Sequence, residues 1–138
     1  MVPVDRGKNA KKFTLGNRLK SFGSAFSGLR LILKNEHNFR IHVFILVIVI
    51  IAGIFFKINA ADWIAITVVS GLVLTAECFN SAIEYLSDAF SPEVNPAIKN
   101  VKDAAAAGVL IAAIVAAVTG IIIFIPEIIE ALYEQSGY

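Results

Sequence analysis

Residues 75–88 read TAECFNSAIEYLSD and place acidic and amide side chains inside sequence that is otherwise apolar enough for a membrane. At about 100° per residue, the polar side chains of this stretch share one face of a helix. We call this set the polar stripe, and its members are Glu77, Asn80, Ser81, Glu84 and Asp88. A carboxylate inside a bilayer costs at least ~2.5–3.5 kcal/mol, so three on one face imply water, a metal, a substrate or a partner subunit opposite them. The polar stripe is therefore a functional-site hypothesis.

The composition around the polar stripe is that of an integral membrane protein. Of the 138 residues, 57% are hydrophobic and 17% are charged. Each membrane-spanning helix needs about 20 residues, so the chain has room for one domain with a few spans and for no separate soluble catalytic domain. The net charge of +1 gives no reason to expect a nucleic-acid partner. Neither the single cysteine, Cys78, nor His37 and His42 has zinc-site spacing, so we interpret Cys78 as packing and both histidines as interfacial.

The apolar pattern predicts an all-α integral membrane fold with one surface helix and three transmembrane helices. Residues 1–17 are polar and basic, and we expect 1–12 to be disordered. Between Leu19 and Leu33 apolar residues recur at three- and four-residue steps among Arg and Lys, which is typical of an amphipathic helix on a membrane surface. We assign this surface helix to 18–35. The spans are expected at 41–56, 63–86 and 104–126, which makes 18–126 one membrane domain and leaves 127–138 as a short exterior tail.

The positive charges predict the orientation of these spans. Nine of the 12 Lys and Arg residues precede the first span, Lys57 is in the first loop, Lys99 and Lys102 are in the second, and the tail has none. The positive-inside rule then places the amino terminus and the second loop in the cytoplasm. Glu36, the later half of the second span and the pair Lys102-Asp103 meet at that cytoplasmic face. The small residues of 104–120 favour close helix packing within or between chains.

The groups that converge there suit phosphoryl transfer. Carboxylate and amide oxygens are ligands for Mg²⁺ rather than for zinc or copper, and they come from Glu36, Glu77, Asn80, Glu84 and Asp88. Lys102, near the start of a helix, is placed to meet phosphate oxygens. These are the groups needed to move phosphate from a nucleotide to a lipid hydroxyl, although the sequence has no glycine-rich phosphate loop of the standard kinds.

Two other interpretations stay open on the residues alone. The acids either form an ion- or proton-conducting site in a small oligomeric channel or transporter subunit, or they pair structurally with Lys99, Lys102 and Arg40. A conducting path is expected to continue polar groups into the exterior half of the membrane. Residues 64–74 offer only Thr67, Ser70 and Gly71 there, which argues against conduction.

The sequence resembles the prokaryotic diacylglycerol kinase family, whose members are small three-span membrane enzymes. The matching residues are Glu77-Cys-Phe-Asn80-Ser-Ala-Ile-Glu84, Asp88, and Lys102-Asp103 followed by an alanine run. Asn35-Glu36 and Phe39-Arg40 match as well, so the resemblance covers most of 18–120. The loop SPEVNP at 91–96 looks more like the undecaprenol kinase branch of this family than the diacylglycerol kinase branch.

This resemblance implies a homotrimer in the bacterial inner membrane that uses Mg-ATP to phosphorylate a membrane lipid alcohol. Undecaprenol is the expected lipid, and diacylglycerol is the alternative. The resemblance also implies Glu77 as the general base and Glu36 and Glu84 as the metal ligands. Nucleotide and phosphate contacts are implied for Asn80, Lys102, Asp103, Glu84 and Glu36. Further candidates for substrate or nucleotide contacts are Arg18, Arg30 and Asp88.

Overall fold

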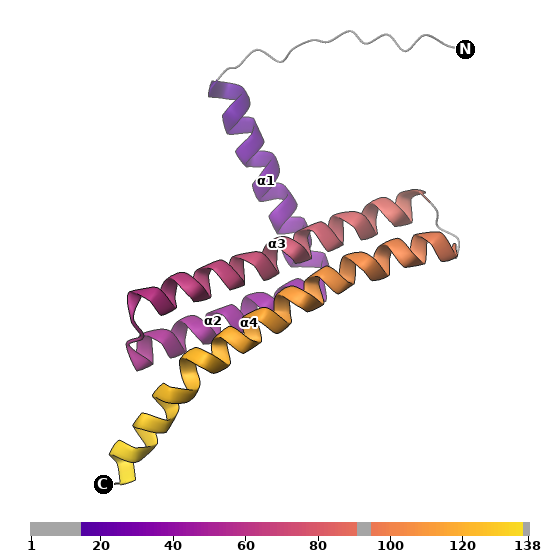
Figure 1. The fold of residues 1–138 in the computed structure, drawn as a ribbon. Helices are drawn as coiled ribbons and strands as arrows, with labels where there is room; N and C mark the ends of the chain where they lie inside the picture. The colour runs from indigo at the N-terminus through magenta and orange to yellow at the C-terminus, as the bar shows by residue number, and fades with distance from the viewer. Residues whose placement is uncertain (1–14, 91–94, 137–138) are drawn as a thin grey trace, which may run out of the picture.

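The computed structural model describes residues 15–90 and 95–136, and these residues form four helices in chain order (Figure 1). They are α1 (Leu15–Asn35), α2 (His37–Phe56), α3 (Ala60–Phe90) and α4 (Pro96–Ser136). In α2, α3 and α4, the segments His37–Phe56, Ala60–Phe90 and Pro96–Glu134 are long and apolar enough to cross a membrane. The predictions of an all-helical fold and of three helices suited to span a membrane are confirmed. Our expectations for residues 1–14 and for the loop at 91–94 lie outside the described residues.

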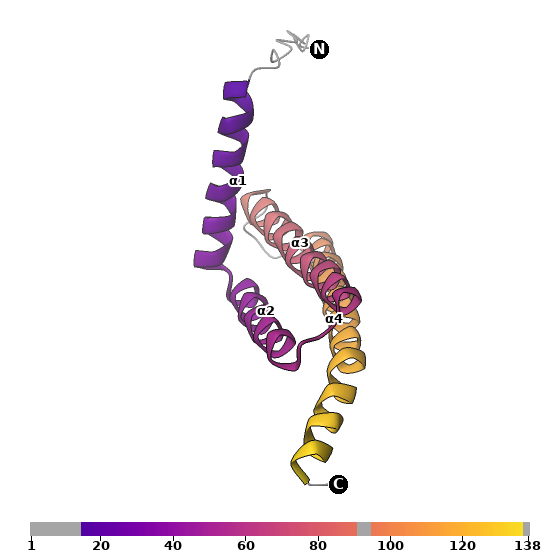
Figure 2. The ribbon, with the colours of Figure 1, turned by 90° about the vertical axis from the view of Figure 1, so that its left-hand side faces the viewer.

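Helix α1 leaves the three apolar helices at a steep angle (Figures 1 and 2). The bend falls at Glu36, whose backbone is extended at φ −92° and ψ 117° between the end of α1 and the start of α2. The apolar side chains of Leu19, Phe22 and Phe26 are exposed on α1. Such a row of exposed apolar groups is compatible with a helix lying on a membrane surface, and that placement stays a prediction.

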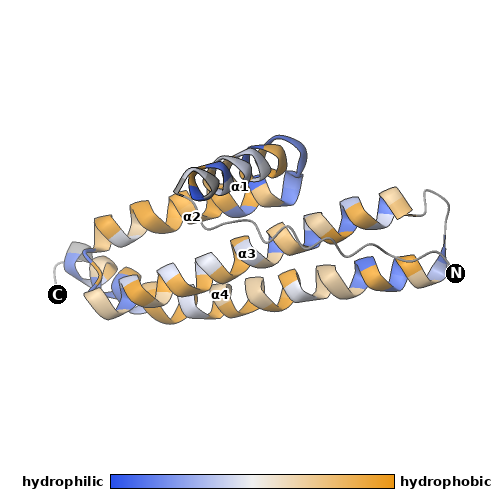
Figure 3. Ribbon diagram, turned by 90° about the horizontal axis from the view of Figure 1, so that it is seen from above, coloured by the Kyte–Doolittle hydropathy of each residue, from blue (hydrophilic) through white to orange (hydrophobic). Residues whose placement is uncertain are grey.

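Helices α3 and α4 make the most extensive contact in the fold, and α2 packs mainly on α3. Hydrophobic residues cover most of α2 and α4 (Figure 3). A small buried core lies beside the turn between α2 and α3, where Ile58, Ile66 and Ile123 pack with Trp63 and four other partly buried side chains. This core lies at the opposite end of α3 from Glu84 and Asp88, so packing fixes one end of the bundle and leaves the other for polar groups.

The turn between α2 and α3 is closed by backbone and side-chain capping. Lys57 adopts the left-handed conformation with φ 54°, which lets the N–H of Ile58 reach the carbonyl of Gly53 at 3.1 Å. Asn59 then caps α3, since its Oδ1 accepts hydrogen bonds from the N–H groups of Ala61 and Asp62 at 2.8 and 3.1 Å. These caps bring Trp63 of α3 directly against Gly53 of α2.

We expect Gly53→Ala to destabilise the protein because no space remains for a side chain. A Cβ at this position would lie 2.9 Å from Trp63 Cη2 and 3.0 Å from Ile58 Cδ1. Overpacking of this kind costs about 1–3 kcal/mol. The measurement is the midpoint of thermal unfolding in detergent, with Gly71→Ala as the matched control. An added Cβ at Gly71 meets nothing within 4 Å, so the control should be neutral or slightly stabilising, and equal midpoints for both variants would contradict the expected clash.

Helices α3 and α4 extend beyond the spans predicted from hydropathy. Helix α3 starts at its Asn59 cap, and α4 starts after Asn95, whose Oδ1 accepts a hydrogen bond from the N–H of Ala97 at 2.9 Å. Helix α4 also continues through Pro126 to Ser136, so most of the predicted tail is helical. Proline removes one backbone hydrogen bond and favours bending rather than ending a long helix here. Figure 1 shows α4 bending in its later part.

Candidate active site

The structure buries the deeper half of the polar stripe. Glu77 and Asn80 are only 2% and 6% exposed, and Ser81 is buried as well. Glu84 is half-buried, and Asp88 is exposed near the end of α3. Ser87 is also buried, a residue that the sequence analysis did not include in the stripe. The stripe therefore runs from an accessible end at Asp88 to an enclosed carboxylate at Glu77.

Hydrogen bonds within α3 orient part of this stripe. The Nδ2 of Asn80 donates to Oε1 of Glu84 at 2.9 Å, and the hydroxyl of Ser81 donates to the backbone carbonyl of Glu77 at 2.9 Å. Among the described residues, no donor reaches Oδ1 of Asn80, although that atom is buried. Asn80 thus fixes Glu84 with one end of its amide and offers an acceptor at the other, whereas the Ser81 hydroxyl is used by the backbone.

Glu36 is brought to the stripe by Tyr85. The Tyr85 hydroxyl donates a hydrogen bond to Oε1 of Glu36, which joins the bend between α1 and α2 to α3 across 49 positions of sequence. Tyr85 follows Glu84 directly, so this hydrogen bond brings Glu36 to the part of α3 that carries the polar stripe. The sequence analysis missed Tyr85, since nothing in its spacing pointed to a residue so far along the chain.

The three apolar helices enclose a hollow of about 250 Å³ beside Glu77. Its lining combines polar side chains with small and branched apolar ones: Asn38 and His42 from α2, Glu77 and Asn80 from α3, and Ala106, Val109, Leu110 and Ala113 from α4. His42, Glu84 and Glu36 lie close enough to Glu77 to act on it electrostatically. The enclosed carboxylate therefore belongs to one electrostatic unit that spans three segments.

Helix α4 closes the accessible end of the stripe with a lysine. Lys102 Nζ forms an ion pair with Oδ1 of Asp88 at 2.7 Å, which links the start of α4 to the end of α3. Asp103 instead pairs with Lys99 one turn earlier on α4, and both of these side chains are well exposed. The structure thus brings Lys102 to the stripe and gives Asp103 a partner outside it.

The two arginine candidates lie on α1, away from the hollow. Arg30 is exposed six residues before Glu36. Arg18 is in the first turns of α1, and at 1.5 Å per residue it is separated from Glu36 by roughly 27 Å of chain. The fold of one chain therefore brings Glu36, Lys102 and Asp88 to the stripe and leaves Arg18 far from it.

The oxygen donors fit a magnesium ion that arrives with a nucleotide. Within the part of the chain that the structure describes, no group of three or more His, Cys, Asp or Glu residues is arranged to hold a metal. Mg²⁺ is usually bound by only one or two protein carboxylates, with phosphate oxygens and water completing its six ligands. Glu36 and Glu84, each oriented by a hydrogen bond, supply that number.

The site combines the enclosed carboxylate of Glu77 with more accessible carboxylates, an amide and a lysine, in a bundle of helices apolar enough to cross a membrane. The sequence model described as prokaryotic diacylglycerol kinase matches residues 23–124. The chain is 31% identical to an undecaprenol kinase of Bacillus subtilis over 114 residues, which cover 83% of this chain and 93% of that protein. It is 32% identical to a diacylglycerol kinase of Synechocystis sp. over 117 residues, 84% of this chain and 67% of that one.

The chain belongs to the prokaryotic diacylglycerol kinase family. It is a membrane lipid kinase, a phosphotransferase, and the resemblance stated from its motifs is confirmed. The family acts with ATP and a divalent metal on a lipid in the membrane. The channel or transporter interpretation is therefore set aside.

Proposed function

We propose that this protein transfers the γ-phosphoryl group of Mg-ATP to the hydroxyl of undecaprenol, with diacylglycerol as the alternative substrate. The hollow at Glu77, bounded by α2, α3 and α4, is the observation that carries the proposal, since it joins a carboxylate to the apolar part of the bundle. Sequence identity to the two relatives, 31% and 32%, does not distinguish between the two lipid substrates. The choice of undecaprenol follows from the loop at 91–96, whose sequence resembles the undecaprenol kinase branch.

Glu77 is the proposed general base. As the lipid oxygen bonds to the γ-phosphorus, the bond from that phosphorus to the bridging oxygen of ADP breaks, and the hydroxyl proton passes to the Glu77 carboxylate. The deep position of Glu77 suits this role, because a lipid hydroxyl approaches from the membrane whereas a nucleotide approaches from water. Burial in the hollow also keeps bulk water from competing with the lipid hydroxyl.

Glu36 and Glu84 are the proposed metal ligands, and Asn80 and Tyr85 hold them in place. Mg²⁺ bound there would neutralise negative charge on the phosphates. Lys102, held near the stripe by Asp88, is proposed to contact phosphate oxygens. Nucleotide contacts by Asn80 and further contacts from Asp103, Asp88, Arg30 and Arg18 remain part of the proposal.

We also propose a homotrimer whose sites form between chains. Asp88 and Arg18 are polar groups that one chain leaves away from its enclosed hollow, and apolar residues cover most of the outer faces of α2 and α4. Gly108 on α4 is open, with nothing within 4 Å of an added Cβ, and small residues of this kind let helices of neighbouring chains approach closely. A closed ring of copies would bring α1 of one chain to the stripe of the next.

The proposed location is the bacterial inner membrane, with the amino terminus and the active site on the cytoplasmic side. The excess of Lys and Arg before α2 supports this orientation. The polar end of the stripe and Lys102 then face the compartment that contains ATP.

A phosphate-transfer assay tests the proposal. Purified protein in mixed micelles receives labelled ATP, Mg²⁺ and either undecaprenol or diacylglycerol at equal mole fraction. We expect labelled undecaprenyl phosphate at the higher kcat/KM and none after chelation of divalent ions. Faster labelling of diacylglycerol would select the alternative lipid, and labelling of neither would reject the proposed reaction. The mass of the active micellar protein is measured in the same preparation, and a fully active monomer would reject the trimer.

A further inference from the structure

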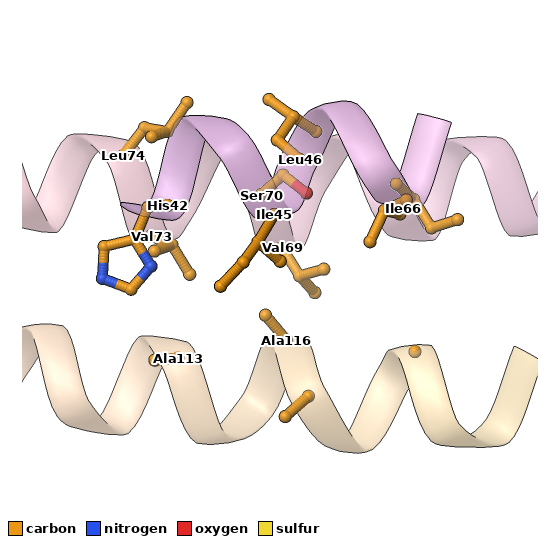
Figure 4. A pocket seen from close by; sticks show the side chains of 13 residues that line it. His42, Ile45, Leu46, Ile66, Val69, Ser70, Val73, Leu74, Ala113 and Ala116 are labelled. Atoms are coloured by element: carbon orange, nitrogen blue, oxygen red, sulfur yellow. The ribbon is translucent and has the colours of Figure 1, made fainter. Parts of the chain in front are cut away.

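An apolar groove of about 230 Å³ runs between α2, α3 and α4 (Figure 4). Apart from His42 and Ser70, all of its lining side chains are apolar or absent, as at Gly120. His42 and Ala113 line both this groove and the polar hollow that contains Glu77, so the two spaces adjoin at these residues. Figure 4 shows His42 at one end of the groove and Ile66 toward the other. The groove therefore leads from the Glu77 hollow into the apolar part of the bundle.

His42 is the polar side chain at the junction of these two spaces. Its imidazole is half-buried, and among the described residues it makes no hydrogen bond. The other histidine, His37, is exposed and hydrogen-bonded to Nη2 of Arg40 at 3.2 Å. A partly buried imidazole with hydrogen-bonding capacity thus lines the same hollow as the candidate base, at the boundary between polar and apolar surface.

We infer that His42 binds the hydroxyl end of the lipid alcohol, with the first part of its hydrocarbon chain lying in the apolar groove. The inference rests on the proposed function. A hydroxyl group has one hydrogen to donate and can accept two hydrogen bonds. It donates to Glu77 and accepts from an imidazole N–H of His42, which leaves a lone pair of the same oxygen to attack phosphorus. His42 is then a lipid-binding residue, distinct from the base and from the metal ligands.

The size of the groove favours one hydrocarbon chain over two. At about 230 Å³ the groove is smaller than most ligand pockets, which measure about 300–1,000 Å³, so it holds only part of a lipid. Its α4 side is made of the smallest side chains, and an added Cβ at Gly120 meets nothing within 4 Å. A polyprenyl alcohol presents a single chain behind its hydroxyl, whereas diacylglycerol presents two. The second chain of diacylglycerol would need room outside the groove, which favours the single-chain lipid.

The test replaces the ring nitrogens of His42 and keeps the ring. In His42→Phe we expect the KM for undecaprenol to rise by about two- to ten-fold, because the lipid hydroxyl loses one hydrogen bond. The KM for ATP should stay unchanged within two-fold. His42→Asn keeps a donor close to the backbone and should recover part of the loss. His37→Phe is the matched control, since the same change on an exposed histidine of the same helix should leave both KM values unchanged.

A second pair of variants tests the groove. Gly120→Leu fills it, and Gly71→Leu adds the same side chain to an exposed position of α3 that does not line the groove. We expect Gly120→Leu to raise the KM for undecaprenol and Gly71→Leu to leave it unchanged. Equal effects of the two variants would overturn the placement of the hydrocarbon chain.

Binding without turnover separates this inference from the proposed reaction. Undecaprenol alone should raise the thermal unfolding midpoint of the wild-type protein, because a ligand that binds only the folded state stabilises it. The shift should be smaller in His42→Phe and normal in His37→Phe. The inference is overturned if undecaprenol raises the unfolding midpoint of His42→Phe as much as that of the wild type, or if the KM of this variant for undecaprenol is unchanged. It is also overturned if the KM for ATP rises as much as the KM for undecaprenol. A wild-type protein that binds undecaprenol without phosphorylating it would instead reject the proposed reaction.

Discussion

Glu77→Gln is expected to lower kcat by about 10²–10⁴-fold while leaving the KM for ATP within a few-fold. Glutamine keeps the size and the hydrogen-bonding shape of the side chain but cannot take up the hydroxyl proton. Because Glu77 lies in the enclosed part of the stripe and Glu84 lies nearer its accessible end, removal of the base should affect chemistry more than nucleotide binding. The measurements are initial rates against ATP at saturating lipid and ATP binding without lipid.

Glu130→Gln provides the matched control for this change. Glu130 is an exposed carboxylate near the far end of α4, so the same substitution there should leave kcat unchanged. If Glu77→Gln lowers the affinity for ATP as strongly as it lowers kcat, Glu77 contacts the metal or the nucleotide instead of acting as the base. If the variant keeps full kcat, Glu77 takes no part in the reaction.

Glu36→Gln and Glu84→Gln should each raise the Mg²⁺ concentration needed for half-maximal activity by roughly ten- to a hundred-fold. Loss of groups that orient a metal ligand already costs this much in metal affinity, so loss of a ligand should cost no less. Tyr85 holds Glu36, Asn80 holds Glu84, and Tyr85 directly follows Glu84 in α3. The double variant should therefore lose less than the product of the single losses, since residues that act as a unit are not additive.

The Mg²⁺ dependence distinguishes this role from a structural one. Glu134→Gln, on the exposed end of α4, serves as the control and should keep the wild-type dependence. If the losses of activity in the two single variants multiply in the double variant, and the Mg²⁺ requirement is unchanged, then Glu36 and Glu84 stabilise helix packing and do not bind a metal.

Helical periodicity accounts for what could be predicted of the site. The spacing of Glu77, Asn80 and Ser81 is enough to place them on one face of a helix, and all three are buried. Periodicity relates only residues within a few turns of each other, so it could not reveal the bond between Tyr85 and Glu36. Periodicity also could not show that the polar side chains of Asn38 and His42 on α2 line the hollow beside Glu77.

Two further features of the structure have local physical causes. Asp103 pairs with Lys99, and the spacing of four residues on one helix already favours such a pair. The helices are longer than the predicted spans because hydropathy detects only the segment suited to lipid. Capping by Asn59 and Asn95 extends α3 and α4 into polar sequence that the hydropathy pattern does not include.

The buried amide oxygen of Asn80 has a consequence for the stability of the resting enzyme. A buried acceptor without a donor costs about 1–3 kcal/mol of folding free energy, and no described residue supplies a donor to this atom. A ligand that donates a hydrogen bond there removes this penalty when it binds. Asn80 lines the hollow beside Glu77, so a ligand bound in the hollow can supply that donor, and a ligand that binds only the folded state stabilises it.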